Sequence, residues 1–172
     1  DLQLSIRGYG ARSTFGVRGV RLVADGIPAT MPDGQGQLSH FALDGAARIE
    51  VLRGPFSVLH GNASGGVVQL FSAEGRDPPE ARLSLVAGSD GLALLSARWL
   101  GHGEAWSQAV SVARFATDGA RVHAAAQRGV ANGKFVREGA NGSRLDVVLN
   151  TLDLRAQDPL RLPSTQWRDD PA

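Results

Sequence analysis

The sequence predicts a mainly β protein in two parts: an α+β part that ends near residue 75, and a row of antiparallel strands after it. The 172-residue chain contains 22 glycines and 8 prolines. The runs between them follow the two-residue period of a strand better than the period of a helix. Residues 73–80 form a polar, proline-containing break. Beyond that break the runs lengthen to about ten residues, which is typical of long strands joined by turns.

The clearest pattern of the first part lies in residues 47–71. Arg48 and Glu50 fall on one face of a charged strand, because successive side chains of a strand point to opposite faces. Ile49 and Val51 fall on the other face. A Gly-Pro turn, a short apolar segment and a pair of glycines follow, and then a second strand begins. We therefore expect a strand that buries one side and presents opposite charges on the other.

Five strands are expected in the second part, at residues 81–87, 91–100, 105–116, 127–137 and 144–154. The last of them alternates most clearly. Its apolar residues Leu145, Val147 and Leu149 fall on one face, and its polar residues Asp146 and Asn150 on the other. In a membrane barrel the first set would face lipid and the second the inside of the barrel. Elsewhere the alternation is weaker, and taken alone this region predicts only an all-β structure.

Composition excludes several classes of protein. The net charge is +1 at pH 7, so no strong attraction to nucleic acid is expected. The chain has no cysteine, which excludes disulfides and thiolate metal sites. No run of 18 apolar residues is present, so no transmembrane helix is predicted. The 18 basic residues include a single lysine, Lys134.

Three motifs resemble one family. Ile6-Arg7-Gly8-Tyr9-Gly10 is similar to I-R-G-F-G, and Val20–Pro28 is similar to a strand that ends in D-G-(I/V)-P. The third motif, within residues 47–71, is similar to R-I-E-V-(I/L)-R-G-P-x-S-x-L-Y-G-x-x-A-x-G-G-V-I. In this order and spacing they resemble the plug domain of TonB-dependent outer-membrane receptors, over about residues 4–73. His60 stands where the family usually has tyrosine.

The resemblance implies a fold. Residues 1–75 are expected to be a plug domain whose N-terminal part is missing, and residues 76–172 the truncated start of an outer-membrane β-barrel. Receptors of this family close a barrel of about 22 strands around the plug, so about five antiparallel strands form an incomplete transmembrane barrel. The links near residues 101–104 and 138–143 are expected on the periplasmic side. The link 117–126 and the tail from Arg155 are expected outside the cell.

The resemblance also implies a function, which is transport across the outer membrane of a Gram-negative bacterium and involves no enzyme chemistry. A scarce solute binds outside, and the TonB–ExbB–ExbD complex drives its import by acting through a segment that this chain does not contain. A ferric siderophore is the expected ligand, with cobalamin, haem, a redox cofactor and an oligosaccharide as alternatives. No bound cofactor and no nucleic-acid partner are expected.

Six residues are expected to contact the ligand at the outward-facing apex of the plug: Arg7, Tyr9, Asp33, Gln35, Gln37 and His60. The guanidinium of Arg7 offers five donors to an anionic ligand, and the imidazole of His60 donates or accepts near neutral pH. The loop 29–37 supplies the acid and the amides. In the alternative interpretation Arg7 pairs internally, His60 packs under a loop, and the loop 29–37 is merely solvated.

Three charged residues, Arg48, Glu50 and Arg53, are expected to pair with charges on the inner wall of the barrel. This expectation follows from the resemblance, because a plug that must loosen benefits from polar, wet contacts. The alternative is a solvent-facing strand edge.

Two other classes of protein stay open at this point. One is a soluble all-β ligand-binding module. The other is a hydrolytic enzyme that uses Ser64 and a histidine, but Asn62 stands where a G-x-S-x-G elbow needs glycine. The four histidines have no metal-ligand spacing.

Overall fold

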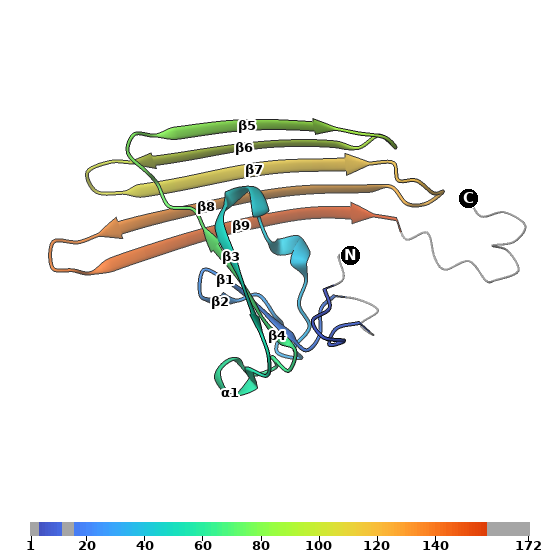
Figure 1. The fold of residues 1–172 in the computed structure, drawn as a ribbon. Helices are drawn as coiled ribbons and strands as arrows, with labels where there is room; N and C mark the ends of the chain where they lie inside the picture. The colour runs from blue at the N-terminus through green and yellow to red at the C-terminus, as the bar shows by residue number, and fades with distance from the viewer. Residues whose placement is uncertain (1–3, 12–15, 158–172) are drawn as a thin grey trace, which may run out of the picture.

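The computed structural model describes residues 4–11 and 16–157, and they form two sheets (Figure 1). A four-stranded sheet has the order β2-β1-β4-β3, and a five-stranded sheet has the order β5-β6-β7-β8-β9. We call them the plug sheet and the wall sheet. The plug sheet stands against one face of the wall sheet, and neither sheet closes on itself. The predicted fold class, a mainly β chain with an open barrel-type sheet, is confirmed.

The plug sheet contains β1 (Val20–Ala24), β2 (Ile27–Pro28), β3 (Ala46–Arg53) and β4 (Gly66–Ser72). The central strands β1 and β4 run parallel, and β3 pairs antiparallel with β4. The connections contain three short helices, η1 (Leu38–His40), η2 (Leu43–Gly45) and α1 (Ser57–His60). The two strands predicted within residues 47–71 are therefore β3 and β4.

The plug sheet has apolar clusters on both faces. Leu22 is fully buried in a cluster with Ile6, Val17 and Phe41, so the first sequence motif packs directly against the second. Val67 belongs to another cluster, which contains Val23 and Ala63 and packs against Leu52 and Phe56. Burial on both faces explains why the central strands read as nearly continuous apolar runs.

One expectation for β3 is wrong. Ile49 and Val51 were expected to form its buried face, but 48% and 51% of their surfaces are exposed. The reason is position, because β3 is the edge strand of the plug sheet. Only Leu52, near the end of β3, packs against the cluster around Val67.

The wall sheet is an antiparallel meander. Its strands are β5 (Glu80–Ala87), β6 (Ala93–His102), β7 (Ser107–Thr117), β8 (Ala126–Glu138) and β9 (Arg144–Ala156). Each predicted strand is found, with ends displaced by two residues at most. β9 runs beyond the predicted loop start at Arg155, because Arg155 and Ala156 pair with β8. The rest of the predicted tail, from residue 158, lies outside the described residues.

The two faces of the wall sheet differ in chemistry. Toward the plug it carries buried polar side chains, namely Ser96, Ser111, Asn132 and Lys134. Asn132 donates a hydrogen bond to Asn150 of β9 (2.7 Å), so Asn150 faces inward, as predicted. The other face carries exposed apolar side chains: Leu83, Leu85, Leu95, Trp99, Val112, Leu145 and Leu149. This alternation is typical of barrel strands in a membrane. No helix in the described part of the chain is long and apolar enough to cross a membrane.

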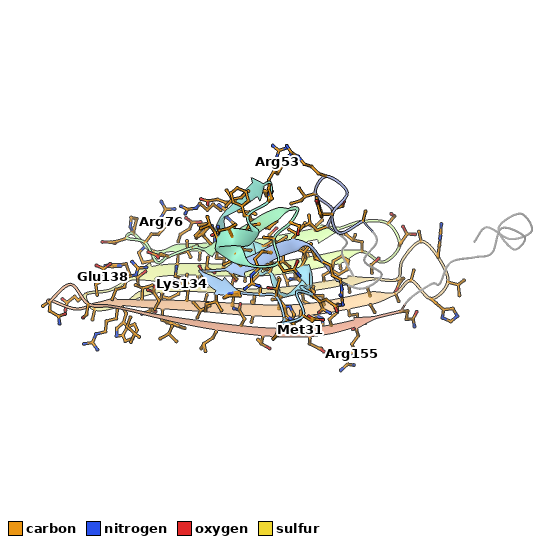
Figure 2. All side chains as sticks on the ribbon, turned by 90° about the horizontal axis from the view of Figure 1, so that it is seen from below. Met31, Arg53, Arg76, Lys134, Glu138 and Arg155 are labelled. Atoms are coloured by element: carbon orange, nitrogen blue, oxygen red, sulfur yellow. The ribbon has the colours of Figure 1, made fainter. Side chains whose placement is uncertain are left out.

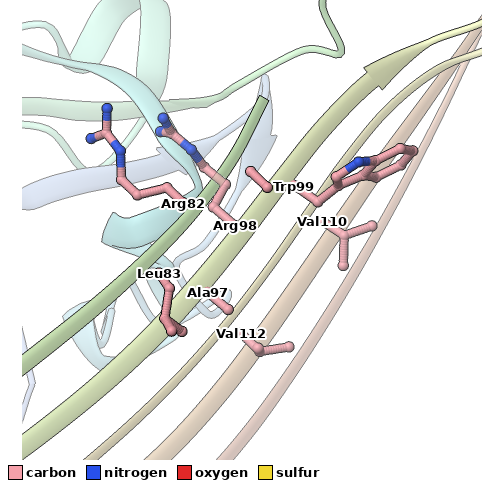
Figure 3. A pocket seen from close by; sticks show the side chains of 8 residues that line it. Arg82, Leu83, Ala97, Arg98, Trp99, Val110 and Val112 are labelled. Atoms are coloured by element: carbon pink, nitrogen blue, oxygen red, sulfur yellow. The ribbon is translucent and has the colours of Figure 1, made fainter. Parts of the chain in front are cut away.

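A shallow groove marks the outward face of β5, β6 and β7 (Figure 3). Its apolar lining consists of Ala81, Leu83, Ala97, Trp99, Val110 and Val112. Arg82 and Arg98 point to the other side of the sheet, toward the plug (Figure 3). The groove therefore belongs to the apolar face of the wall sheet, on the side away from the plug sheet.

Candidate ligand site and plug–wall contacts

The first candidate segment is a tight turn. The amide of Ile6 donates to the carbonyl of Tyr9, and the amide of Tyr9 donates to the carbonyl of Ile6, each over 3.0 Å. Arg7 lies in this turn with φ near +51°, and its side chain is exposed. The ring of Tyr9 packs against Gly65, where a Cβ would collide with it. Because residue 65 is a glycine, the turn that contains Arg7 and Tyr9 can pack against the third motif.

The second candidate segment is the loop that contains Asp33, Gln35 and Gln37. The Asp33 carboxylate accepts a hydrogen bond from the amide of Gln35 (3.0 Å). Arg18 binds the loop twice, through the side-chain oxygen of Gln35 (3.3 Å) and the carboxylate of Asp33 (3.6 Å). Arg18 was missed in the sequence because it belongs to no motif. Gln37 is half-buried and precedes η1.

The third candidate segment approaches the second through Asn62. The side chain of Asn62 fills the space beside Gly34, where φ is +80°. His60 ends α1, half-buried, two residues before Asn62. The three candidate segments therefore adjoin, with Tyr9 on Gly65 and Asn62 on Gly34. Ligand contact by any of the six predicted residues stays a prediction.

The charged strand β3 makes contacts within the plug sheet. Arg48 Nε lies 2.9 Å from the carboxylate of Glu50, and its guanidinium stacks 4.1 Å from the ring centre of Phe71. Arg53 is exposed and lies on the opposite side of the plug from Met31 (Figure 2). Pairing of Arg48, Glu50 and Arg53 with the barrel wall stays a prediction.

An ion cluster joins the plug to the wall. Lys134 Nζ on β8 lies 3.0 Å from a carboxylate oxygen of Glu74 and 3.6 Å from one of Asp25. Asp25 also accepts hydrogen bonds from the amide (2.9 Å) and the hydroxyl (2.6 Å) of Ser72. Arg144 of β9 reaches the same oxygen of Glu74 over 2.6 Å. One lysine thus contacts both the β1–β2 turn and the segment that follows β4.

The cluster favours the ionised form of Glu74. Partial burial opposes ionisation, but hydrogen bonds from Lys134 and Arg144 outweigh it, and the pKa of Glu74 lies below its ordinary value.

A second contact uses backbone carbonyls. Arg128 of β8 donates to the carbonyl of Ser39 through Nε (3.1 Å) and Nη2 (2.8 Å), and to the carbonyl of Phe41 through Nη2 (2.7 Å). Ala42 packs beside it against Ala113 and Val130. The segment from η1 to η2 is therefore docked by charged hydrogen bonds and a small apolar contact.

Sequence reasoning missed the residues of these two contacts, Asp25, Glu74, Arg128 and Lys134. One signal was available. Arg128, Asn132 and Lys134 share one face of the predicted strand 127–137, and Lys134 is the only lysine beside 17 arginines. Their partners lie in distant segments, so no local pattern identifies them.

Comparison with known proteins agrees with this architecture. Residues 1–67 match the model of the TonB-dependent receptor plug domain. The pyoverdine outer membrane receptor FpvA from Pseudomonas aeruginosa PAO1, solved with pyoverdine bound, is 19% identical with a TM-score of 0.64. The alignment covers 78% of this chain and 20% of that one.

Two further structures are siderophore receptors named PirA. The one from Pseudomonas aeruginosa is 21% identical with a TM-score of 0.65, over 87% of this chain and 27% of that one. The one from Acinetobacter baumannii is 15% identical with a TM-score of 0.64, over 79% of this chain and 24% of that one. The chain spans between 20% and 27% of the length of these three structures. Residues 1–67 thus match the TonB-dependent receptor plug domain, and the chain as a whole has the fold of a plug followed by the first barrel strands of a TonB-dependent receptor.

Proposed function

We propose that this chain is part of an outer-membrane transporter that binds a scarce solute outside the cell and imports it into the periplasm with TonB-coupled energy. One observation carries the proposal: a plug domain is seated on the polar face of a sheet whose other face is apolar. Such a sheet suits a barrel wall between lipid and a plugged lumen. The plug spans residues 1–75 in this proposal and the wall begins at residue 76.

The proposed ligand is a ferric siderophore, taken up at the apex of the plug. The similar structures support this choice, because FpvA was solved with pyoverdine and both PirA proteins are named siderophore receptors. Arg7 and His60 are the central contacts of the proposed site, with Tyr9 and the loop residues around them. A charged hydrogen bond from Arg7 to an anionic ligand is worth roughly 1.5–3 kcal/mol.

The experiment uses the full-length receptor in whole cells without an energy source, so that binding is separated from transport. Ferric siderophores are the first probes, with cobalamin and haem as alternative ligands. Arg7→Ala should weaken binding by roughly ten- to a hundredfold, and His60→Ala by less, since a neutral imidazole forms the weaker bond. Arg155→Ala is the matched control, because Arg155 lies on the wall sheet. Unchanged affinity in both plug variants would move the site to the extracellular loops of the barrel.

Transport and its energy source are tested next. Uptake of the bound ligand should stop when the proton-motive force is dissipated or the TonB protein is deleted, whereas binding should persist. Uptake that continues without TonB would contradict the coupling.

The charged residues of β3 have a proposed role in holding the plug. Arg48, Glu50 and Arg53 lie at the free edge of the plug sheet, where further wall strands would stand. The double variant Arg48→Glu, Glu50→Arg should disturb uptake or plug retention while binding largely survives. Normal uptake by this variant would mean that the two side chains are merely solvated.

A further inference from the structure

We propose that Lys134 is the residue that keeps the wall-side end of the plug seated on the barrel while the rest of the plug loosens during uptake. The inference rests on the proposed function, because it assigns a retaining role within that transporter. Its basis is the cluster of Lys134 with Asp25 and Glu74, which are carboxylates from two separate segments of the plug.

Burial makes this contact costly to open. Only 11% of the Lys134 side chain and 8% of the Asp25 side chain are exposed. A buried ammonium or carboxylate is tolerated when it is paired, and becomes strongly unfavourable when its partner leaves. Ser72 of β4 binds both carboxylate oxygens of Asp25, so Asp25 moves with the plug sheet and would be drawn away from Lys134 if that sheet shifted. Separating the two side chains while the surrounding packing stays closed would leave two buried charges without compensation.

The surroundings of Lys134 are closely packed. Ala73 is buried against Leu100 and Ala109 of the wall. The amide of Gly75 donates to the Ser107 hydroxyl over 2.8 Å, and a side chain at position 75 would collide with the wall backbone at Gly101. From here the chain runs directly into β5. The apolar packing of Ala73, the close approach of Gly75 to the wall and the covalent connection to β5 all favour a closed contact between Lys134 and the plug.

The apex makes a different kind of contact. The turn at Arg7 rests on Gly65, and the loop at Asp33 and Gln35 is held by Arg18. These partners are all plug residues, and the charged ones are exposed. Polar, solvated contacts of this kind contribute little each, so the apex can rearrange when the ligand binds without disturbing Lys134.

The test uses the full-length receptor in living cells and does not depend on knowing the ligand. The probe is a large glycopeptide antibiotic that an intact outer membrane excludes. Lys134→Met keeps the apolar stem and removes the charge, and we expect a loss of exclusion while ligand binding at the apex is unchanged. Lys134→Arg should restore exclusion, because it returns a cation to both carboxylates. Arg155→Met is the matched control on a neighbouring strand and should exclude the antibiotic normally.

A second variant keeps the test decisive if Lys134→Met fails to insert. The triple variant Lys134→Met, Asp25→Asn, Glu74→Gln removes all three charges, so no unpaired charge stays buried. The triple variant should insert and still lose exclusion. Normal exclusion by an inserted triple variant would overturn the proposal, because the ion cluster would then not be what retains the plug. Wild-type receptor that excludes the antibiotic but takes up no ligand would contradict the proposed ligand instead, and would leave the exclusion test valid.

Discussion

The central strands of the plug sheet are buried on both faces, whereas the wall sheet presents one face to the plug and the other to its surroundings. Leu22 and Val67, on β1 and β4, are fully buried within the plug. In the wall, Leu83 and Leu85 are each 75% exposed. This difference in burial indicates that the two sheets are stabilised in different ways. The plug carries its own core, and the wall depends on its hydrogen-bonded ladders, on the plug and on an apolar environment outside.

The seam between the two sheets combines both kinds of chemistry. Arg128 and Lys134 of β8 supply charged hydrogen bonds, and small side chains such as Ala73 and Ala113 supply the apolar contacts. Small residues let the two backbones approach, and the cations fix the register of the plug on the wall. A seam of this kind is specific without being extensive.

The largest expected effect concerns the exterior of the wall. The 172-residue chain purified without detergent should aggregate, because its outward leucines and the edges of its wall sheet are exposed. Replacing Leu83, Leu85 and Leu95 together by threonine should reduce this aggregation while keeping β propensity. Gel filtration measures the aggregated fraction of the unchanged chain and of the threonine variant. A sharp monomeric peak with cooperative melting for the unchanged chain would contradict the comparison and favour a soluble binding module.

A smaller effect is expected in the plug core. Leu22→Ala should lower the free energy of unfolding by about 2–5 kcal/mol, as deletion of a fully buried leucine does. Leu85→Ala, in the exposed face of the wall, should cost much less in detergent, because micelles solvate that position in both states. Denaturant midpoints of the full-length receptor in detergent measure the two changes. Equal losses for the two variants would mean that the wall has a core of its own.

The sequence determines these two regions through different signals, and each signal has a limit. The wall strands were predictable to within two residues because alternation and glycine-rich turns are local features. The plug motifs predicted the order of its segments. The exposure of Ile49 and Val51 was not predictable, since it depends on β3 being an edge strand, and strand order is not a local property.

The residues of the candidate site and of the seam also differ in how far the sequence reveals them. Arg7 and His60 stand in motifs, so the sequence alone suggests them as ligand contacts, and their contact with a ligand stays a prediction. Arg18, which holds the Asp33 loop, stands in no motif. Lys134 was visible as the only lysine, but its partners come from segments that meet only in the folded chain. The position of a charged residue along a strand indicates which face its side chain occupies, but it does not identify the residues that the side chain contacts.

The seam itself is tested by Arg128→Met, which keeps the apolar stem and removes the guanidinium. Hydrogen bonds to charged groups contribute about 1.5–3 kcal/mol, and the variant leaves the carbonyls of Ser39 and Phe41 without their donor. Proteolysis between residues 38 and 45 in the detergent-solubilised receptor should therefore become faster. Arg114→Met serves as the control, since Arg114 lines the outward face of the wall sheet together with Leu83, Leu95 and Val112. Unchanged proteolysis for Arg128→Met would show that the small apolar contact alone holds this segment.

The smallest expected effect is the pH dependence of the seam. The pKa of Glu74 is lowered in the folded chain, so the folded state favours the ionised form. This contribution is fully present above the ordinary pKa of a glutamate, and it is lost as the pH falls through the lowered value. It is small because 45% of the Glu74 side chain is exposed, and solvent screens its ion pairs.

Denaturant midpoints measured from neutral pH down to the acid range test this contribution. Glu74→Gln should lower the midpoint slightly at neutral pH and converge with the wild type in acid, where both side chains are uncharged. Glu138→Gln is the matched control: Glu138 contacts the same Arg144 over a longer distance of 3.5 Å and is 75% exposed. Its curve should follow that of the wild type throughout. A Glu74→Gln curve parallel to the wild type over the whole range would mean that Glu74 joins the plug to the wall through its shape and packing, and that its charge contributes nothing to the seam.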